Sequence, residues 1–360
     1  MEFLLFLSFL FFLGILEIFD WTNEKYLAYI LSFIVFCLFS GLKYDVGTDY
    51  STYRYYYNNS MNWSIMNANG VEIGYIYIMQ LFKNLSIGFV GFWFILSFVN
   101  FCFKYYIFHK YSPLLFASLL LYFVGMFLER DFDGIRQGFA MGVCYLAIPF
   151  IFRRQILPFL LLVLLASTVH ASSLVFLPAY YLVSFNVSNR IIYISVSILV
   201  LMVILNISFT KMLVSVLPES IIKMRLNSYM SVADSQYTKK VGLSIGMIFR
   251  IGILFLYTSL NNKDFIKDEK LYIFLRNGFF LGIVLSLIFN DFDILSHRLS
   301  YIYREFQIFI VPALIYVCRS RKLRLVLLGA LFFYSMVLLY RYLNADTLKD
   351  YYNYKNFLFQ

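Results

Sequence analysis

The first apolar run, "MEFLLFLSFLFFLGILEIF" at residues 1–19, sets the fold class. Its length matches the roughly 17–25 residues with which an α-helix crosses a bilayer. Similar runs recur along all 360 residues, of which 61% are hydrophobic and only 14% charged. A soluble domain carries about a quarter charged residues. The sequence therefore predicts an all-α, polytopic integral membrane bundle, whose first run is kept as a span because it lacks a basic start and a cleavage site.

The apolar runs correspond to about twelve transmembrane helices, within a range of about 10–14. We place them at 3–20, 26–42, 87–108, 113–129, 134–152, 155–170, 172–186, 191–209, 241–260, 272–290, 299–318 and 323–342. They form a single transmembrane domain over 1–360, with polar loops at about 43–70 and 210–240. The segment 71–86 is apolar but short, so we expect an interfacial or re-entrant helix there.

Basic residues set the expected orientation. The short turns at 153–154 and 319–324 contain Lys and Arg without any acid, which favours the cytoplasmic side for both. The net charge of +10 fits the same bias, and we expect no nucleic-acid partner. The breaks in the apolar pattern at 43–70, 129–134, 170–172, 210–240 and 290–298 then face outward.

Ionisable residues cluster at three of these external breaks. Within a membrane protein, such residues indicate a functional site. The stretch "LERDFDGIRQGFAMG" (128–142) contains Arg130, Asp133, Arg136 and Gln137, with Gly138 and Gly142 allowing a close neighbour. "STVHASS" (167–173) contributes His170, and "NDFDILSHRLSYIYRE" (290–305) contributes His297, Arg298 and Arg304. Arginine suits bidentate phosphate recognition, so these clusters fit an anionic lipid headgroup.

The tripeptide Asp-Phe-Asp occurs twice, at 131–133 and 291–293. Two carboxylates at this spacing can hold Mg²⁺ against a diphosphate. The alternative is that they pair with Arg130, Arg136 and Arg298. The four cysteines lack metal-ligand spacing and are predicted to be core thiols. We expect neither a metal nor a cofactor.

Four segments resemble, in order, motifs of the EpsG-like, Wzy-type polysaccharide polymerases. They are "VGTDYSTYRYYY" (46–57), "IRQGFAMGVCYLAI" (135–148), "HASSLVFLPAYYL" (170–182) and "SHRLSYIYREFQIFIVP" (296–312). The resemblance implies a polymerase of O-antigen or related exopolysaccharide in the bacterial plasma (inner) membrane, similar to GT-C-like polymerases and ligases. Such a glycosyltransferase moves a glycan from undecaprenyl pyrophosphate onto a hydroxyl of an incoming lipid-linked unit, without nucleotide sugar. A chain-length regulator protein is a partner that the resemblance allows.

This chemistry needs a stabilised pyrophosphate leaving group and a base for the acceptor hydroxyl. We predict Arg136, Arg298 and Arg304 for the first role and His170 for the second, with Asp49 or Asp133 as alternative bases. The predicted substrate-binding residues are Asp49, Tyr50, Tyr53, Arg54, Arg130, Asp133, Gln137 and His297. For the tyrosines, the alternative is an interfacial aromatic belt.

Other functions stay open at this point. A flippase or exporter of lipid-linked sugars would need similar aromatic and cationic residues, although internal repeats are expected there. A membrane O-acyltransferase would place His170 on the cytoplasmic side. A non-enzymatic scaffold would tolerate the loss of Arg136, Arg298 and His170.

Overall fold

The computed structural model describes residues 1–21, 25–216, 218, 242–260, 268–344 and 353–359. This part of the chain is helical and contains no strand apart from an isolated bridge between Lys43 and Asn356. The all-α prediction is confirmed. The helices form two compact units, 1–177 with 311–360 and 178–310, and each unit is described by itself. Most of the predicted loop 210–240 lies outside the described residues.

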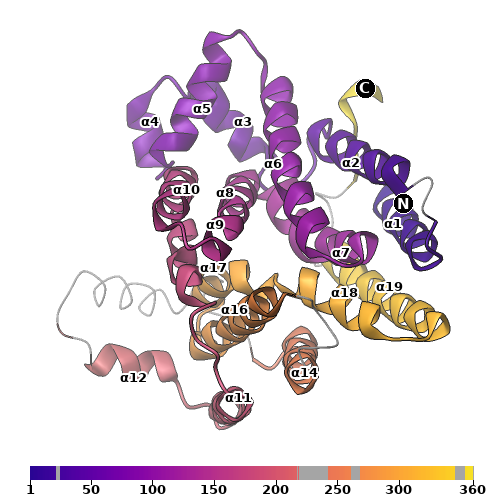
Figure 1. The fold of residues 1–360 in the computed structure, drawn as a ribbon. Helices are drawn as coiled ribbons and strands as arrows, with labels where there is room; N and C mark the ends of the chain where they lie inside the picture. Colours follow the sequence, from indigo (N-terminus) through magenta and orange to yellow (C-terminus); the bar gives the residue numbers. More distant parts are fainter. Residues whose placement is uncertain (22–24, 217, 219–241, 261–267, 345–352, 360) are drawn as a thin grey trace. The chain divides into compact units, whose positions relative to one another are not determined.

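The first unit holds the N-terminal helices and the C-terminal one (Figure 1). Its elements are α1 (Glu2–Ile18), α2 (Lys25–Gly41), α3 (Tyr50–Asn59), α4 (Trp63–Ala68), α5 (Ile73–Asn84), α6 (Phe89–Tyr111), α7 (Leu115–Tyr122), a π-helix η1 (Phe123–Asp133), α8 (Ile135–Leu146), α9 (Ile148–Phe152), α10 (Ile156–Val169), α19 (Arg321–Leu343) and η4 (Phe357–Phe359). The short helices α3, α4 and α5 lie together beside the N-terminal end of α6. A helix does form within 71–86, and its place in the membrane interface stays a prediction.

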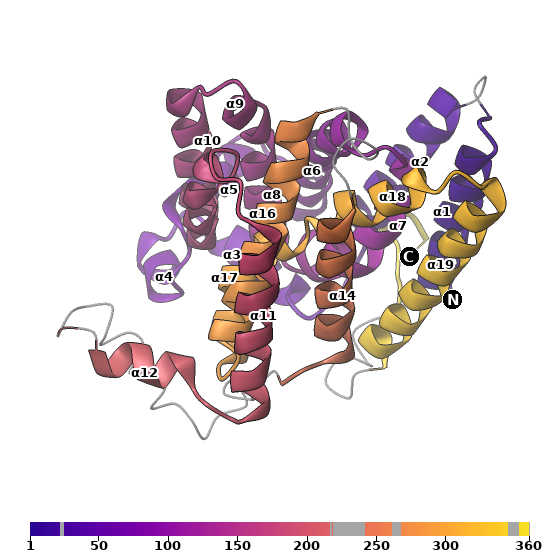
Figure 2. The same ribbon diagram turned by 60° about the horizontal axis from the view of Figure 1, so that its bottom comes forward.

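The second unit is built around α16 (Glu269–Ile288). This helix packs against α11 (Asn189–Ile204), α14 (Ile245–Ser259) and α17 (Asp293–Arg304), as Figure 2 shows. The unit also contains α12 (Phe209–Val216). The 3₁₀-helix η2 (Ala171–Tyr181) and α18 (Gln307–Val317) contain the two points where the chain passes between units. The span predicted at 172–186 is thus 3₁₀ over most of its length, and it contains Pro178, which has no backbone N–H to donate.

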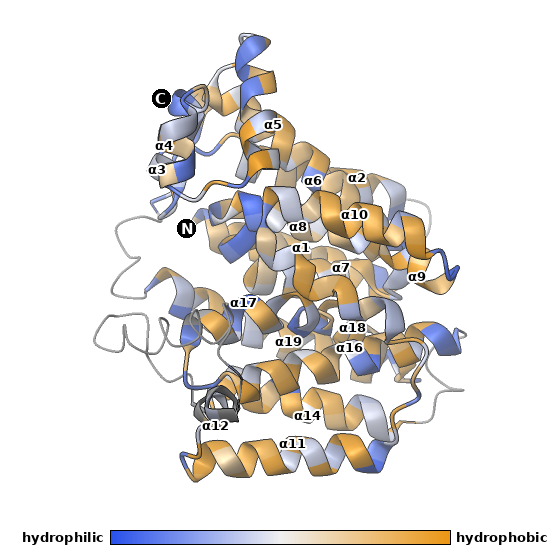
Figure 3. Ribbon diagram, turned by 90° about the vertical axis from the view of Figure 1, so that its left-hand side faces the viewer, coloured by the Kyte–Doolittle hydropathy of each residue, from blue (hydrophilic) through white to orange (hydrophobic). Residues whose placement is uncertain are grey.

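Several helices have the length and composition of membrane spans. Within the described residues, four long segments qualify, Phe89–Tyr111, Ile135–Phe152, Glu269–Ile288 and Arg321–Leu343, and four shorter apolar helices accompany them. On α11, the large apolar side chains Ile191, Ile194, Ile198 and Leu201 form an exposed stripe at helical spacing. Figure 3 shows that hydrophobic residues predominate along α10, α11 and α14, whereas α3 and α4 are more polar. An exposed apolar stripe of this kind suits contact with lipid. The number of about twelve spans stays a prediction.

Cysteine burial differs from the sequence prediction at two positions. Cys37 and Cys144 are buried, whereas Cys102 is exposed and Cys318 is partly exposed. Cys102 lies on an exposed face of α6 together with Phe98 and Tyr106, which are spaced four residues apart. The prediction of core thiols is therefore wrong for Cys102, because that face of α6 is not covered by the unit.

Small residues bring the site helices together, as predicted. A Cβ at Gly138 would collide with the Asp131 carboxylate and with the backbone of Arg130. A Cβ at Gly142 would lie 2.5 Å from Asn100 Oδ1 on α6. Glycine at these two positions lets α8 contact η1 and α6 directly, which fixes the start of α8 beside the end of the π-helix. π-Helical segments are rare in proteins, and those that occur are often found at functional sites.

Candidate functional site in the first unit

Arg136, at the start of α8, forms an ion pair with Glu72. Its Nη1 lies 2.8 Å from Glu72 Oε2, and both side chains are about four-fifths buried, with exposed fractions of 18% and 20%. Glu72 is the residue before α5, where its backbone is extended. Its other oxygen, Oε1, accepts a hydrogen bond of 3.3 Å from the backbone N–H of Ala171, the neighbour of His170. One carboxylate therefore joins two of the predicted catalytic segments, 135–148 and 170–182.

Three tyrosine rings surround the Arg136 guanidinium. Its Cζ lies 5.6 Å from the ring centroid of Tyr53 and 5.7 Å from those of Tyr56 and Tyr75. All three rings are buried. Burial raises the pKa of Tyr53 to about 12, so its hydroxyl stays protonated at neutral pH. The rings hold the cation in one orientation through cation–π contacts.

His170 is oriented by the turn that follows it. Its Nδ1 accepts hydrogen bonds from the backbone N–H of Ser172, at 3.3 Å, and lies 2.8 Å from the Ser172 hydroxyl. A backbone N–H can only donate, so Nδ1 is the unprotonated nitrogen and the proton of the neutral ring is on Nε2. This tautomer makes Nε2 a hydrogen-bond donor.

Asp133 holds the loop at the start of α3. Its Oδ1 accepts a hydrogen bond of 3.0 Å from the backbone N–H of Asp49, and its Oδ2 accepts one from the Thr48 hydroxyl. Gly47 turns the chain here with φ of +97°, and a Cβ would lie 2.6 Å from Asp133 Oδ1. Only glycine adopts this conformation readily. Because both oxygens of Asp133 accept hydrogen bonds, this carboxylate acts as an anchor for the loop.

Asp49, the residue that precedes α3, keeps part of its surface exposed to solvent, and the pKa of its carboxyl group is shifted. Desolvation and repulsion by Asp133 raise its pKa above the ordinary value, and attraction to Lys43, Arg136 and Arg130 opposes the rise. Asp49 thus belongs to the same charge cluster as Arg136. In the part of the chain that the structure describes, Asp49 forms no ion pair with Arg54, the cation five positions further along.

Lys43 is a cluster member that sequence reasoning missed. Its ammonium group is buried, donates to the Phe132 carbonyl and lies 4.5 Å from the ring centroid of Trp93 and 4.3 Å from that of Phe132. Burial lowers the pKa of Lys43 to about 8, although Asp133 and Asp49 partly offset the effect. Its position directly after the second apolar run made it resemble an ordinary end-of-span lysine. Glu72 was missed for a similar reason, since it lies inside a stretch of uncertain membrane position.

The two carboxylates of the first Asp-Phe-Asp bind different groups. Asp131 is buried and accepts from Lys104, from Asn100 Nδ2 at 2.6 Å and from the Tyr122 hydroxyl at 2.6 Å. Asp133 binds the loop as described above. Arg130 lies 3.7 Å from Glu129, and the neighbouring Gln137 is buried in α8. Among the described residues, no cluster of three or more His, Cys, Asp or Glu side chains could hold a metal ion.

The remaining predicted residues of the first unit lie on α3. Tyr50 is buried against Phe89 and Trp93, with ring centroids 5.3 and 6.1 Å apart. Arg54 lines an open cavity whose lining includes neither Tyr53 nor Arg136. The predicted residues of α3 therefore lie in two places, Tyr53 at the Arg136 cage and Tyr50 and Arg54 at the open cavity.

Three predicted residues lie in the second unit. His297 Nε2 lies 3.3 Å from Asp293 Oδ1, and Nδ1 lies 3.4 Å from Arg304 Nη2, so Asp293, His297 and Arg304 form a chain along α17. Arg304 is buried, with its guanidinium 5.3 Å from the Tyr301 ring centroid, while Arg298 is exposed. The two arginines thus face different sides of the helix.

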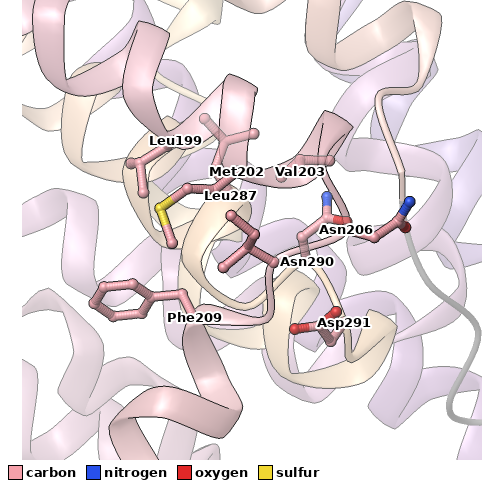
Figure 4. Close-up of a pocket in the computed structure, with 9 residues that line it drawn as sticks. Leu199, Met202, Val203, Asn206, Phe209, Leu287, Asn290 and Asp291 are labelled. Carbon is pink, nitrogen blue, oxygen red and sulfur yellow. The ribbon is translucent and has the colours of Figure 1, made fainter.

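The second Asp-Phe-Asp borders a small cavity in the second unit. The cavity, of about 20 Å³, is shown in Figure 4 with Asn206, Asn290 and Asp291 among its lining residues. Asp291 accepts from the Ser208 hydroxyl, and the Asn290 amide exchanges hydrogen bonds of 3.2 and 3.1 Å with the backbone of Gly242. This volume suits one water molecule, and the polar groups around it already have protein partners.

A family comparison decides the assignment, because one family model, described as the EpsG family, matches residues 25–356. The chain belongs to the EpsG family. No curated protein and no solved structure matches the chain. The match covers the Arg136 cluster, the His170 turn and α17 together. Membership in this family, together with the apolar helices, indicates a membrane protein with a polysaccharide polymerase-type function.

Proposed function

We propose that this EpsG family member polymerises a bacterial surface polysaccharide, of the O-antigen or exopolysaccharide type, at the outer face of the plasma membrane. In this proposal it is a Wzy-type, GT-C-like enzyme with about twelve spans. Its substrates are oligosaccharide repeat units linked to undecaprenyl pyrophosphate. The observation that supports the proposal best is the Glu72 carboxylate, which joins Arg136 to the turn that carries His170.

The reaction breaks the bond between the anomeric carbon of the donor sugar and its diphosphate oxygen. A new bond forms between that carbon and the acceptor hydroxyl, and the lipid diphosphate leaves with the electron pair. Arg136, pre-oriented by three tyrosine rings, is placed to stabilise the charge that develops on the leaving group. His170 supports this role as a donor through Nε2, given the hydrogen bonds at its Nδ1.

The hydroxyl proton then needs another acceptor. Among the three predicted bases, Asp133 accepts two hydrogen bonds from the loop, and the tautomer of His170 places a proton on Nε2. Asp49 keeps an exposed carboxyl with a raised pKa, in the same charge cluster as Arg136. A base with a pKa closer to the working pH transfers protons more effectively. We therefore assign the proton to Asp49 in this mechanism.

The proposal changes the roles predicted for Arg298 and Arg304, which the sequence assigned to the leaving group, and keeps His297 at the substrate-binding surface. Arg298 is exposed and suits direct contact with an anionic group, whereas Arg304 is buried and orients His297. This split suggests that Arg298 binds substrate and that Arg304 supports the binding surface.

The test is a reconstitution. The purified full chain is incubated with lipid-linked repeat units alone, without nucleotide sugar or ATP, and products are separated by size. A ladder of longer glycans is expected, and its loss in Arg136→Ala is expected as well. Arg321→Ala is the matched control, because Arg321 is exposed and forms its ion pair with Asp20, at 3.0 Å, rather than with a residue of the site. Absence of elongation with active, folded protein would reject the proposal, and elongation by Arg136→Ala at the normal rate would reject its site.

A further inference from the structure

The mechanism above does not use an open cavity in the first unit. This cavity of about 780 Å³ is open to solvent. Thirteen residues line it, among them Arg54, Asn58, Gly88, Phe89, Phe94 and Phe357. They come from the end of α2, from α3, from the first turns of α6 and from the C-terminal segment.

The cavity has one cationic group and no acidic side chain among its lining residues. Arg54 has neither a hydrogen bond nor an ion pair within the part of the chain that the structure describes. This distinguishes it from Arg136, whose charge is paired with Glu72. An unpaired guanidinium beside an acid-free surface favours an anionic ligand, and its donor geometry suits phosphate. The amide of Asn58, one turn further along α3, adds a donor.

The other wall of the cavity is apolar. Phe89, Phe94 and Ile95 come from α6, which is long and apolar enough to cross a membrane, and Phe357 and Leu358 come from the C-terminal segment. Phe357 and Leu358 are 47% and 65% exposed. The cavity therefore begins at the end of a candidate span, with its cation at the polar side and apolar side chains beside it. This charge and hydropathy pattern matches a lipid with a phosphate headgroup.

Helix α3 contributes side chains both to this cavity and to the Arg136 cage. Tyr53 contacts Arg136, and Arg54, the next residue, lines the cavity. The proposed polymerisation brings together two lipid-linked units, each with its own diphosphate, and the Arg136 cage holds one of them. A second anion site, to which α3 also contributes, supplies the place that the other unit needs.

We propose that the Arg54 cavity binds the diphosphate and the first isoprenoid units of the acceptor, while Arg136 serves the donor. This assignment rests on the proposed function. It specifies the substrate-binding role that the sequence predicted for Arg54. The acceptor lipid then lies along α6 with its headgroup at α3.

The experiment measures binding rather than turnover. Farnesyl diphosphate, a short lipid diphosphate, is titrated into the detergent-purified full chain, and bound copies are counted by native mass spectrometry. Two copies are expected for the wild type and one for Arg54→Ala, with affinity at the lost site falling about tenfold or more. Gly88→Leu is expected to remove the same copy while keeping Arg54, because Gly88 lines the cavity and a Cβ there meets no atom within 4 Å.

Each alternative outcome has a definite meaning. Unchanged stoichiometry in both Arg54→Ala and Gly88→Leu would overturn the cavity assignment, while elongation by the wild type in the reconstitution would leave the proposed function standing. Equal binding of inorganic diphosphate at this site would overturn the lipid part of the assignment. A lost copy in Arg136→Ala but not in Arg54→Ala would place binding at the cage alone and would also overturn it.

Discussion

Glu72 Oε2 and Arg136 Nη1 lie 2.8 Å apart although 64 residues separate them in the sequence. The same carboxylate reaches the backbone of Ala171 with its other oxygen. Three segments that are distant in the chain are therefore held by one acidic side chain. The ion pair also weakens the binding of an anion to Arg136, since a bound diphosphate competes with Glu72 for the guanidinium.

Glu72→Gln is expected to lower turnover and strengthen anion binding. The amide removes the competing negative charge from Arg136 but no longer holds its guanidinium by an ion pair. We expect kcat about tenfold lower, which corresponds to ~1.4 kcal/mol of transition-state stabilisation, together with tighter inhibition by farnesyl diphosphate. Both values are measured in the reconstituted assay. Unchanged kcat and unchanged inhibition would contradict the role of Glu72, and Lys83→Gln at the other end of α5 is the control.

Asp49→Asn is expected to abolish elongation, because Asp49 is the group whose protonation slows the wild-type enzyme at acidic pH. Because the pKa of Asp49 is raised, the wild-type rate falls as pH drops through a value above that of an ordinary Asp carboxyl. The pH dependence of kcat checks this expectation. Asp45→Asn is the control, since Asp45 is an exposed neighbour with φ of +53°, which Asn tolerates. A full rate in Asp49→Asn would show that another group takes the proton.

His170→Gln is expected to keep more activity than His170→Asn. A Gln side chain places an N–H donor near the position of Nε2, whereas Asn places its amide near Nδ1. If His170 acts as a donor, His170→Gln keeps a measurable fraction of the rate while His170→Asn loses about 10²-fold or more. Equal loss in both variants, with normal expression, would support the role as base predicted from the sequence.

Lys43→Met is expected to reduce the pH dependence of the free energy of unfolding at alkaline pH. The folded pKa of Lys43 is lowered to about 8 from its ordinary value of 10.5, so the unfolded chain binds more protons between these values. Stability of the wild type therefore gains a contribution that rises with pH across this window, by about 3 kcal/mol in total. Thermal unfolding in detergent between pH 7.5 and 10.5 measures it. A profile in Lys43→Met with the wild-type slope would contradict a buried, destabilised ammonium.

Gly138→Ala is expected to reduce the yield of folded protein, because the added Cβ would collide with Asp131 and with the backbone of Arg130. The matched control is Gly329→Ala on α19, where a Cβ meets no atom within 4 Å. That control should be neutral or stabilising by roughly 0.5–1 kcal/mol, owing to the better helix propensity of alanine. Size-exclusion profiles and thermal midpoints compare the two. Equal stability of both variants would mean that η1 can move away from α8.

The amino-acid sequence alone determined the helical membrane class and the family. Both depend on local properties, namely apolar runs of span length and four short motifs in a fixed order. The same local reading identified Arg136, His170, Asp49 and Asp133, because charges at the ends of apolar runs stand out. It also identified Gly138 and Gly142 as points of close packing, which the structure confirmed.

Tertiary structure alone decided which partners these residues have. Glu72 and Lys43 have unremarkable neighbours in the chain, and only folding brings them to Arg136, Asp133 and the Phe132 carbonyl. The two carboxylates of the first Asp-Phe-Asp face different partners, and Arg54 faces a cavity rather than Asp49. The physical reason is that the burial and the partners of a polar side chain depend on segments distant in sequence. Burial and partners together set its charge state and decide which of its donors and acceptors are left for a ligand. The sequence shows which groups are present, and the packing of α3, α5, α8 and η1 determines which of them meet.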